Sequence, residues 1–150
     1  AAPPSREAWA KEAGFGVVVG IGMFAVFVAA AAVGRHFSFL ADAIDRILRK
    51  ADGGPLVAVL GVALVNGVAE ELFFRGALVE ALGPLRRRTW IVSLALYVVV
   101  TAAGGNTALT LAAVVMGAVF AIERWRTGTL VAPIATHLVW STLMILAFPR

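Results

Sequence analysis

The sequence predicts an all-α membrane protein, a multi-pass transmembrane helical bundle with about five spans and one interfacial amphipathic helix. Three observations predict this fold class: 61% of the 150 residues are hydrophobic, only 15% are charged, and the apolar residues form long uninterrupted runs. A soluble domain usually has roughly 45–50% apolar and about 25% charged residues. This chain therefore has too few polar side chains to cover a surface that faces water.

Composition and charge exclude several other classes of protein. The chain has no cysteine, no low-complexity polar tract and no glycine repeat, which excludes disulfide-stapled, disordered and collagen-like proteins. Its 13 basic and 9 acidic residues give a net charge of +4. The basic residues lie in short gaps between apolar runs, where they set membrane topology, so we expect no nucleic-acid partner.

The first expected span is the uncharged run 15–33, which is long enough to cross a bilayer as a helix. A signal peptide is the alternative, with Arg6 and Lys11 ahead of the apolar run. The run is longer than the usual apolar core of a signal peptide, which favours a span. Within it, Gly16 and Gly20 have the spacing that permits two helices to approach closely.

Residues 36–50 predict the amphipathic helix, because apolar residues recur at helical spacing and charged residues occupy the other face. The Gly-Gly-Pro sequence at 53–55 ends this helix and begins the next one. We expect a division here between an N-terminal part, residues 1–54, and a membrane core, residues 55–150. Because the first residue is alanine, we also expect the chain to be processed or to be part of a longer product.

Four further spans are expected, at residues 55–82, 91–103, 107–122 and 129–148. Gly83 and Pro84 end the first of these, and Glu123 with the basic residues after it ends the third. The loops on the side of the N-terminus carry more basic residues than those on the other side; they hold Arg6, Lys11 and the runs 86–88 and 124–126. The positive-inside rule therefore predicts a cytoplasmic N-terminus and an external C-terminus.

Charged side chains inside a span cost about 2.5–3.5 kcal/mol each on insertion scales, and this chain concentrates them in one helix. Glu71 and Arg75 are four residues apart, so they share a helix face and can pair. Glu70 is rotated by about 100° on an α-helix, and Asn66, one turn earlier, is placed to hydrogen-bond it. Two neighbouring carboxylates in different surroundings are typical of acid/base chemistry.

The structural alternative is that this helix simply emerges into the headgroup region, where Glu and Arg are solvated. Apolar residues lie between the charges and continue through Val79, and the basic boundary comes only at Arg86. These observations favour a buried functional site over a solvated helix end.

Two other spans carry polar residues at helical spacing. His137 and Ser141 are four residues apart on the last span and share a face. Ser93, Tyr97 and Thr101 form a similar stripe on the third span, for which packing and local hydrogen bonding are the favoured interpretation. A lone histidine often has such a structural role too, but beside an acidic cluster a functional role for His137 is the better hypothesis.

The pattern EExxxR, formed by Glu70, Glu71 and Arg75, precedes further spans and a C-terminal intramembrane histidine. In this order it resembles the CPBP family of intramembrane metalloproteases, which includes the CAAX prenyl endopeptidases and the bacterial Abi proteins. The resemblance covers about residues 55–148. It implies that Glu70 activates the attacking water, that Glu71 is its partner and that Arg75 orients the pair.

The family's later motifs, FxxxH and HxxxN, are matched in part. Tyr97 falls at the aromatic position of the first, and Thr101 stands where the family has histidine. His137 matches the histidine of the second, and Ser141 replaces its asparagine. Threonine is a poor zinc ligand and cannot act as a base near neutral pH.

The resemblance implies a glutamate-dependent intramembrane endopeptidase that cleaves a membrane-associated peptide or a prenylated-type C-terminus. It further implies that Glu70 and His137 hold Zn²⁺, and that His137 and Ser141 donate hydrogen bonds to the oxyanion. The expected partners are the lipid bilayer of a bacterial cell and a membrane-associated peptide or protein substrate; no oligomeric state is predicted.

Two alternatives to this enzyme stay open. The first is a catalytically impaired relative that binds a partner as a membrane immunity or scaffold protein, which Thr101 favours. The second is a small transporter with Glu70 in a proton relay.

Overall fold

The computed structural model of the chain describes residues 5–51, 53–83 and 87–148, and the regular elements in these ranges are all helical. This confirms the predicted all-α fold class. The predicted stop at Pro84 and the first residue of the basic run at Arg86 lie outside the described residues. The elements are α1 (Arg6–Gly34), α2 (Ser38–Ala51), α3 (Leu56–Glu70), the π-helix η1 (Glu71–Ala77), α4 (Leu78–Ala81), α5 (Arg87–Ala102), α6 (Thr107–Thr127) and α7 (Val131–Ala147).

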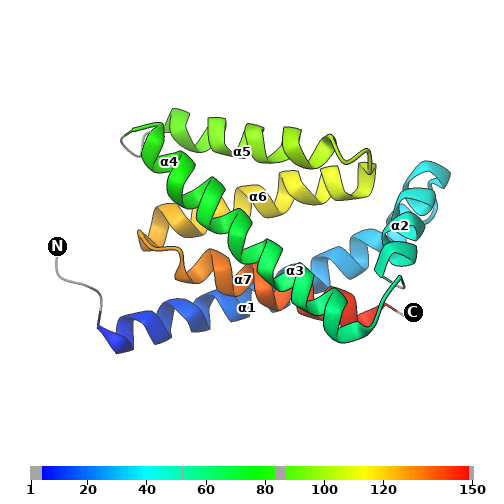
Figure 1. Ribbon diagram of the computed structural model, residues 1–150, viewed down its shortest axis with the longest axis horizontal. Coiled ribbons are helices and arrows are strands. Elements are labelled where there is room, and N and C mark those ends of the chain that lie inside the picture. Colours follow the sequence, from blue (N-terminus) through cyan, green and yellow to red (C-terminus); the bar gives the residue numbers. More distant parts are fainter. Residues whose placement is uncertain (1–4, 52, 84–86, 149–150) are drawn as a thin grey trace.

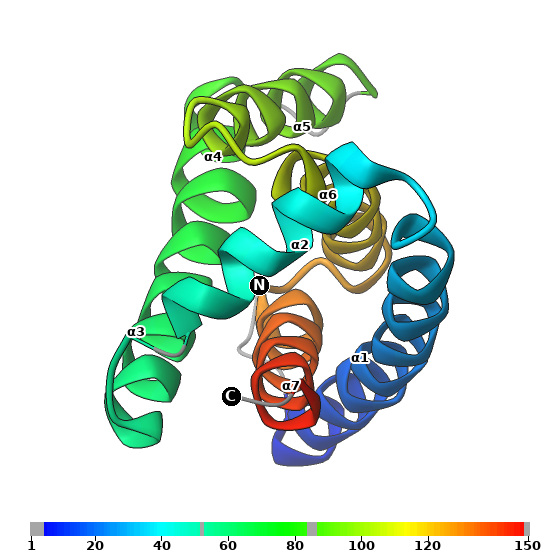
Figure 2. The ribbon, with the colours of Figure 1, turned by 90° about the vertical axis from the view of Figure 1, so that its right-hand side faces the viewer.

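The central helix of the bundle is α7, which packs against α1, α3 and α6 (Figures 1 and 2). On the outer side of α6 lies α5, while α3 crosses the bundle obliquely and continues through η1 into α4. Figure 2 shows α2 lying across one end of the bundle. Because α7 contacts three helices, a polar side chain on it can meet partners from several parts of the chain.

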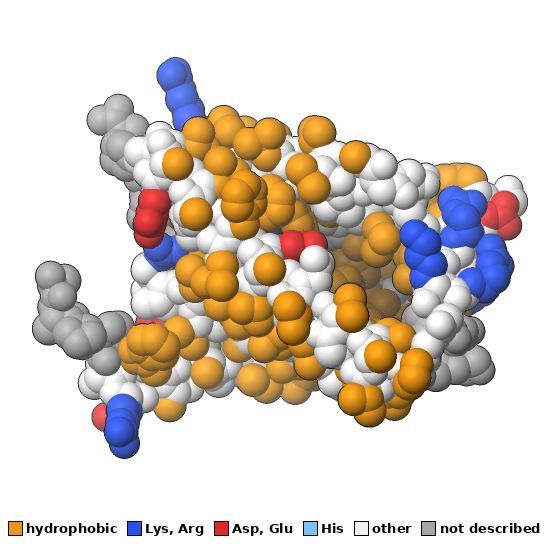
Figure 3. Space-filling model, in the orientation of Figure 1, with side chains coloured by type: hydrophobic (Ala, Val, Ile, Leu, Met, Phe, Trp, Pro, Cys, Tyr) orange, Lys and Arg blue, Asp and Glu red, His pale blue; other side chains and the backbone are white. Residues whose placement is uncertain are grey.

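The distribution of side chains is the reverse of that in a soluble protein. Large apolar side chains cover much of the outer surface, as Figure 3 shows for one face. The charged residues Glu71, Arg75 and Glu123 are at most 2% exposed. In water such a surface would be a very large apolar patch, whereas lipid solvates it without cost. The protein is therefore a membrane protein.

Helix lengths agree with this conclusion. In the part of the chain that the structure describes, three helical segments are long and apolar enough to cross a membrane, namely Arg6–Gly34, Leu56–Ala81 and Thr107–Thr127. Two further apolar helices are shorter, Arg88–Ala102 and Val131–Ala147. The five apolar segments expected from the sequence are thus all helical.

Two details of the elements differ from expectation. The fourth span was predicted to end at residue 122, but α6 continues to Thr127, where Gly128 ends it with a φ of 74°. Glu123, expected at the boundary, is instead buried inside the bundle, because α7 covers it. The predicted amphipathic helix is present as α2, and its residues Leu40, Ile44, Ile47 and Leu48 line a cavity shared with the other helices.

Helices α1 and α7 approach each other closely at two glycines of α1. A Cβ atom on Gly16 would lie 2.4 Å from the carbonyl oxygen of Ala132, and one on Gly20 would lie 2.9 Å from the carbonyl oxygen of Thr136. The two glycines therefore allow the helix backbones to touch, as their spacing predicted.

Replacing Gly16 tests this contact. We expect Gly16→Ala to lower the free energy of unfolding by about 1–3 kcal/mol, because the new methyl group meets backbone that cannot move aside. Gly22→Ala is the matched control, since its Cβ would meet nothing within 4 Å. Unfolding followed by circular dichroism in mild detergent measures both variants, and equal stability of the two would contradict the observed packing.

Candidate active site

The carboxylate of Glu70 lies where α3 meets α5. Its Oε1 accepts a hydrogen bond of 2.7 Å from Nδ2 of Asn66, the partner expected from the spacing. Its Oε2 accepts a hydrogen bond of 3.2 Å from the hydroxyl of Tyr97 on α5. Glu70 stays partly exposed, and each carboxylate oxygen can accept a second hydrogen bond. The group is therefore both oriented and able to bind a further donor such as water.

The neighbouring Glu71 has completely different surroundings. Its Oε1 accepts a hydrogen bond of 3.1 Å from Nη1 of Arg75 and lies 3.1 Å from Nδ1 of His137. The side chains of Glu71 and Arg75 are 0% and 1% exposed, so the pair expected from the sequence forms inside the bundle. An isolated buried charge is very costly, and pairing removes most of that cost.

This arrangement fixes the orientation of His137 and the position of its proton. An ion-paired carboxylate can only accept, so Nδ1 of His137 carries the proton of the contact with Glu71. The ring stacks on Phe120, with centroids 4.8 Å apart and an angle of 18° between the planes. It also lies against Gly67, where a Cβ would come within 3.3 Å of the ring. Nε2 is the nitrogen left for a substrate or a proton.

The helix changes from α- to π-type hydrogen bonding at the boundary between the two glutamates. Glu70 ends α3, and Glu71 begins η1, in which hydrogen bonds span five residues instead of four. The sequence did not predict this turn, because its residues have no pattern that distinguishes a π-turn from an α-helix. With the turn in place, Glu70 reaches α5 and Glu71 reaches α7.

Besides Glu71, Arg75 contacts groups on α5 and α6. Its Nη2 donates a hydrogen bond of 3.3 Å to the carbonyl oxygen of Gly117 on α6. Its guanidinium carbon lies 4.4 Å from the ring centre of Tyr97 and 5.1 Å from that of Phe120, within the range of a cation–π interaction. Gly117 and Phe120 were not predicted as partners of Arg75. They lie in an apolar span, and their spacing of three residues does not distinguish them from other residues of that helix.

The polar stripe on α5 divides into separate roles. The hydroxyl of Ser93 donates to the carbonyl oxygen of Phe74, at 2.6 Å, and ties α5 to η1. The hydroxyl of Thr101 donates to the carbonyl oxygen of Tyr97 in its own helix, at 2.9 Å. For Ser93 and Thr101 the structure thus agrees with the favoured interpretation, packing and local hydrogen bonding. Tyr97 is different, because its hydroxyl is hydrogen-bonded to the side chain of Glu70.

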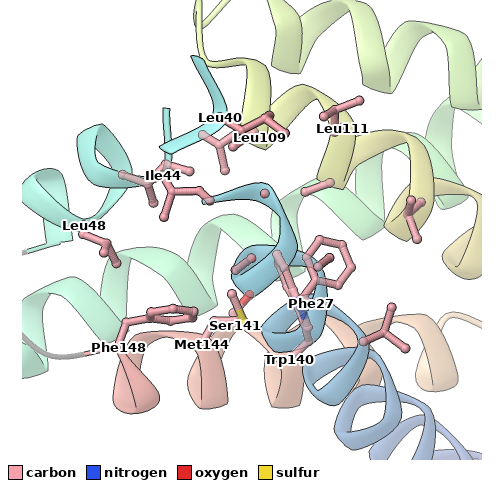
Figure 4. Close-up of a pocket in the computed structure, with 18 of the residues that line it drawn as sticks. Phe27, Leu40, Ile44, Leu48, Leu109, Leu111, Trp140, Ser141, Met144 and Phe148 are labelled. Carbon is pink, nitrogen blue, oxygen red and sulfur yellow. The ribbon is translucent and has the colours of Figure 1, made fainter. Parts of the chain in front are cut away.

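Ser141 lies one helical turn after His137, in the wall of an apolar cavity of about 460 Å³ enclosed by α1, α2, α3, α6 and α7. Figure 4 shows it beside Trp140, with apolar side chains around the rest of the cavity. Its hydroxyl has no hydrogen bond to another described residue. The volume is within the range of ligand pockets, about 300–1,000 Å³. In Figure 3 a hollow opens on the apolar face, with acidic side-chain atoms beside it.

A further buried acid, Glu123, was missed by the sequence reasoning. Its Oε1 lies 2.6 Å from the hydroxyl of Thr136, which is also 3.0 Å from the carbonyl oxygen of Gly16. These contacts join α6, α7 and α1. At the end of an apolar run, a glutamate that will be buried cannot be distinguished from one that faces water.

The zinc site implied by the resemblance was tested against the donor groups present. Zinc in proteins usually takes three or four protein ligands. In the described ranges no three His, Asp or Glu side chains are grouped so that they could hold a metal ion. Glu70 and Nε2 of His137 would supply at most two ligands, since Nδ1 of His137 is committed to Glu71. The residues do not fit a zinc site, and no step proposed below passes through a metal.

Comparison with known proteins identifies the family. A search of curated proteins and a search of solved structures give no match. A family model described as type II CAAX prenyl endopeptidase Rce1-like matches residues 52–143, which is more than half of the chain and includes the polar residues described above from Asn66 to Ser141. The chain therefore belongs to the Rce1-like family of type II CAAX prenyl endopeptidases.

Proposed function

We propose that the chain is a multi-pass intramembrane endopeptidase in which Glu70 is the general base. The family is one of proteases. The observation that carries the proposal is the difference between the two adjacent glutamates. Glu71 is buried and neutralised by Arg75, whereas Glu70 is partly exposed and held by a donor on each oxygen. One carboxylate thus stabilises the bundle, and the other is free to exchange a proton.

In the proposed reaction a water molecule loses a proton to the Glu70 carboxylate while its oxygen attacks the scissile carbonyl carbon. The carbon–nitrogen bond then breaks, and the proton passes from Glu70 to the leaving nitrogen, which regenerates the carboxylate. Ser141 donates a hydrogen bond to the oxyanion, and His137 does so when Nε2 is protonated. Hydrogen bonds of this kind are strong in a site that excludes bulk water.

The proposed substrate is a membrane-associated peptide or protein with an apolar, prenylated-type C-terminus. The support is the apolar cavity, whose wall includes Ala63 and Ser141. Ala63 lies two helical turns before Glu70, and Ser141 lies one turn after His137. Apart from Ser141 and the indole N–H of Trp140, the described lining side chains are apolar, so the cavity favours a hydrocarbon group.

We also propose a bacterial cell-membrane location with a cytoplasmic N-terminus. The excess of basic residues in the loops on that side supports this orientation. In the bundle, α1 begins at the end opposite to that where α7 finishes (Figure 1), as expected for an odd number of spans.

Replacing Glu70 tests the proposed base. Glu70→Gln keeps the shape of the side chain, but it replaces one acceptor oxygen by an NH2 donor and cannot accept the proton, so we expect cleavage to slow by at least about 100-fold. The assay uses the full chain in lipid nanodiscs and a quenched-fluorescent peptide with a farnesylated C-terminal motif. Glu80→Gln, on the exposed side of α4, is the matched control. Retained turnover in Glu70→Gln would refute the assignment.

One observation favours a second candidate function, a noncatalytic immunity or scaffold protein. Thr101 is bonded to its own helix, so α5 supplies no second base to Glu70. In that case the wild-type chain binds the fluorescent peptide, as measured by anisotropy, without cleaving it. Metal analysis is a separate check: stoichiometric zinc that is lost in His137→Ala would favour a metalloenzyme over both proposals.

The ion pair has a structural role that can be tested apart from catalysis. Arg75→Met leaves Glu71 buried without its counter-charge, so we expect a loss of about 3–5 kcal/mol in the free energy of unfolding. Adding Glu71→Gln removes the uncompensated charge and should restore most of that loss. Unfolding titrations of both variants in mixed micelles measure this. If the double variant is as unstable as Arg75→Met, the neutralisation argument is wrong.

A further inference from the structure

We propose that Tyr97 is the positioning residue of Glu70, and that it transmits the positive charge of Arg75 to the Glu70 carboxylate. This inference rests on the proposed function, because it concerns the group that prepares the proposed base. It assigns to the phenol hydroxyl a role that the hydroxyl groups of Ser93 and Thr101, on the same helix, do not have.

The hydrogen bonds of α5 single out Tyr97. Ser93 and Thr101 each donate to a backbone carbonyl oxygen. Of these three residues, Tyr97 is the one hydrogen-bonded to Glu70, with 3.2 Å between the hydroxyl oxygen and Oε2. The opposite oxygen of the carboxylate is held by Asn66 at 2.7 Å. With a donor on each oxygen, the plane of the carboxylate is fixed.

The ring that carries this hydroxyl is itself held on several sides. Tyr97 is 7% exposed, and its ring packs edge-on against Phe74, with the centroids 5.1 Å apart. Gly117 leaves room for it on α6, where a Cβ would come within 2.9 Å of the ring. The hydroxyl therefore has a defined position before any substrate binds, which is the condition for a preorganised site.

The guanidinium of Arg75 lies 4.4 Å from the centre of the same ring. A cation over an aromatic face draws electron density toward it, and this makes the phenol O–H a stronger donor. The charge of Arg75 thus acts on both glutamates, on Glu71 directly and on Glu70 through the ring of Tyr97. A hydrogen bond to a charged group contributes more than one between neutral groups.

A spectroscopic experiment tests the contact without any assay of activity. Tyr97 is the single tyrosine of the chain, so tyrosine labelled with ¹³C at Cζ gives one NMR signal from the full protein in nanodiscs. We expect this signal to shift in Glu70→Gln, where a neutral amide replaces the charged acceptor, and to stay in place in Glu80→Gln. An unchanged signal in Glu70→Gln would overturn the inference.

A kinetic experiment tests the positioning role with the farnesylated peptide. Tyr97→Phe keeps the ring under Arg75 and removes only the hydroxyl, so we expect kcat to fall by about 10- to 100-fold while KM changes by less than about twofold. Thr142→Val is the matched control, because its hydroxyl bonds only the carbonyl oxygen of Leu138 in its own helix.

The two experiments separate the possible failures. A wild-type kcat in Tyr97→Phe would overturn the positioning role. If the NMR signal responds to Glu70→Gln but the wild-type chain cleaves no peptide, the proposed function is overturned and the contact between Tyr97 and Glu70 is left in place. A rise in KM with unchanged kcat would show that Tyr97 acts in substrate binding instead, and would also overturn the inference.

Discussion

The buried charge of Arg75 is the constraint on which the rest of the site depends. A guanidinium inside a bundle whose surface is apolar must be neutralised and its donors satisfied. Glu71 supplies the counter-charge, the carbonyl oxygen of Gly117 accepts from Nη2, and the rings of Tyr97 and Phe120 lie against the cation. One side chain thus links η1 to α5 and α6, and through Glu71 and His137 to α7.

The division of roles between the two glutamates follows from this constraint. Glu71 is fully buried, and one of its oxygens pairs with Arg75 and lies against His137. Glu70, one residue earlier, is left outside the ion pair and meets only neutral donors, Asn66 and Tyr97. The π-turn that begins at Glu71 lets adjacent residues reach different helices, and such turns are frequent at functional sites.

The spans and the cluster of charged residues could be predicted from the sequence, because charge is costly in lipid. Long uncharged runs indicate spans, and Glu70, Glu71 and Arg75 stand out as charged residues within one of them. It gave no information on contacts between distant helices, such as that of Tyr97 with Glu70 or of Glu123 with Thr136. A buried glutamate near a helix end has the same sequence signature as a solvated one, so Glu123 was placed at a boundary although it lies inside.

The polar site and part of the cavity wall come from different parts of the chain. The polar residues from Asn66 to Ser141 lie within the segment that matches the family, residues 52–143. Much of the cavity wall comes from α1 and α2, ahead of that segment; the lining residues there include Phe27, Leu40, Ile44 and Leu48. The N-terminal helices therefore shape the space beside the site, whereas the hydrogen-bond partners of Glu70 and His137 named above lie in the segment that matches the family. We expect a chain with the same central helices and a different N-terminal part to retain the proposed proton chemistry and to accept a different apolar group, since function is determined by the site and not by the fold alone.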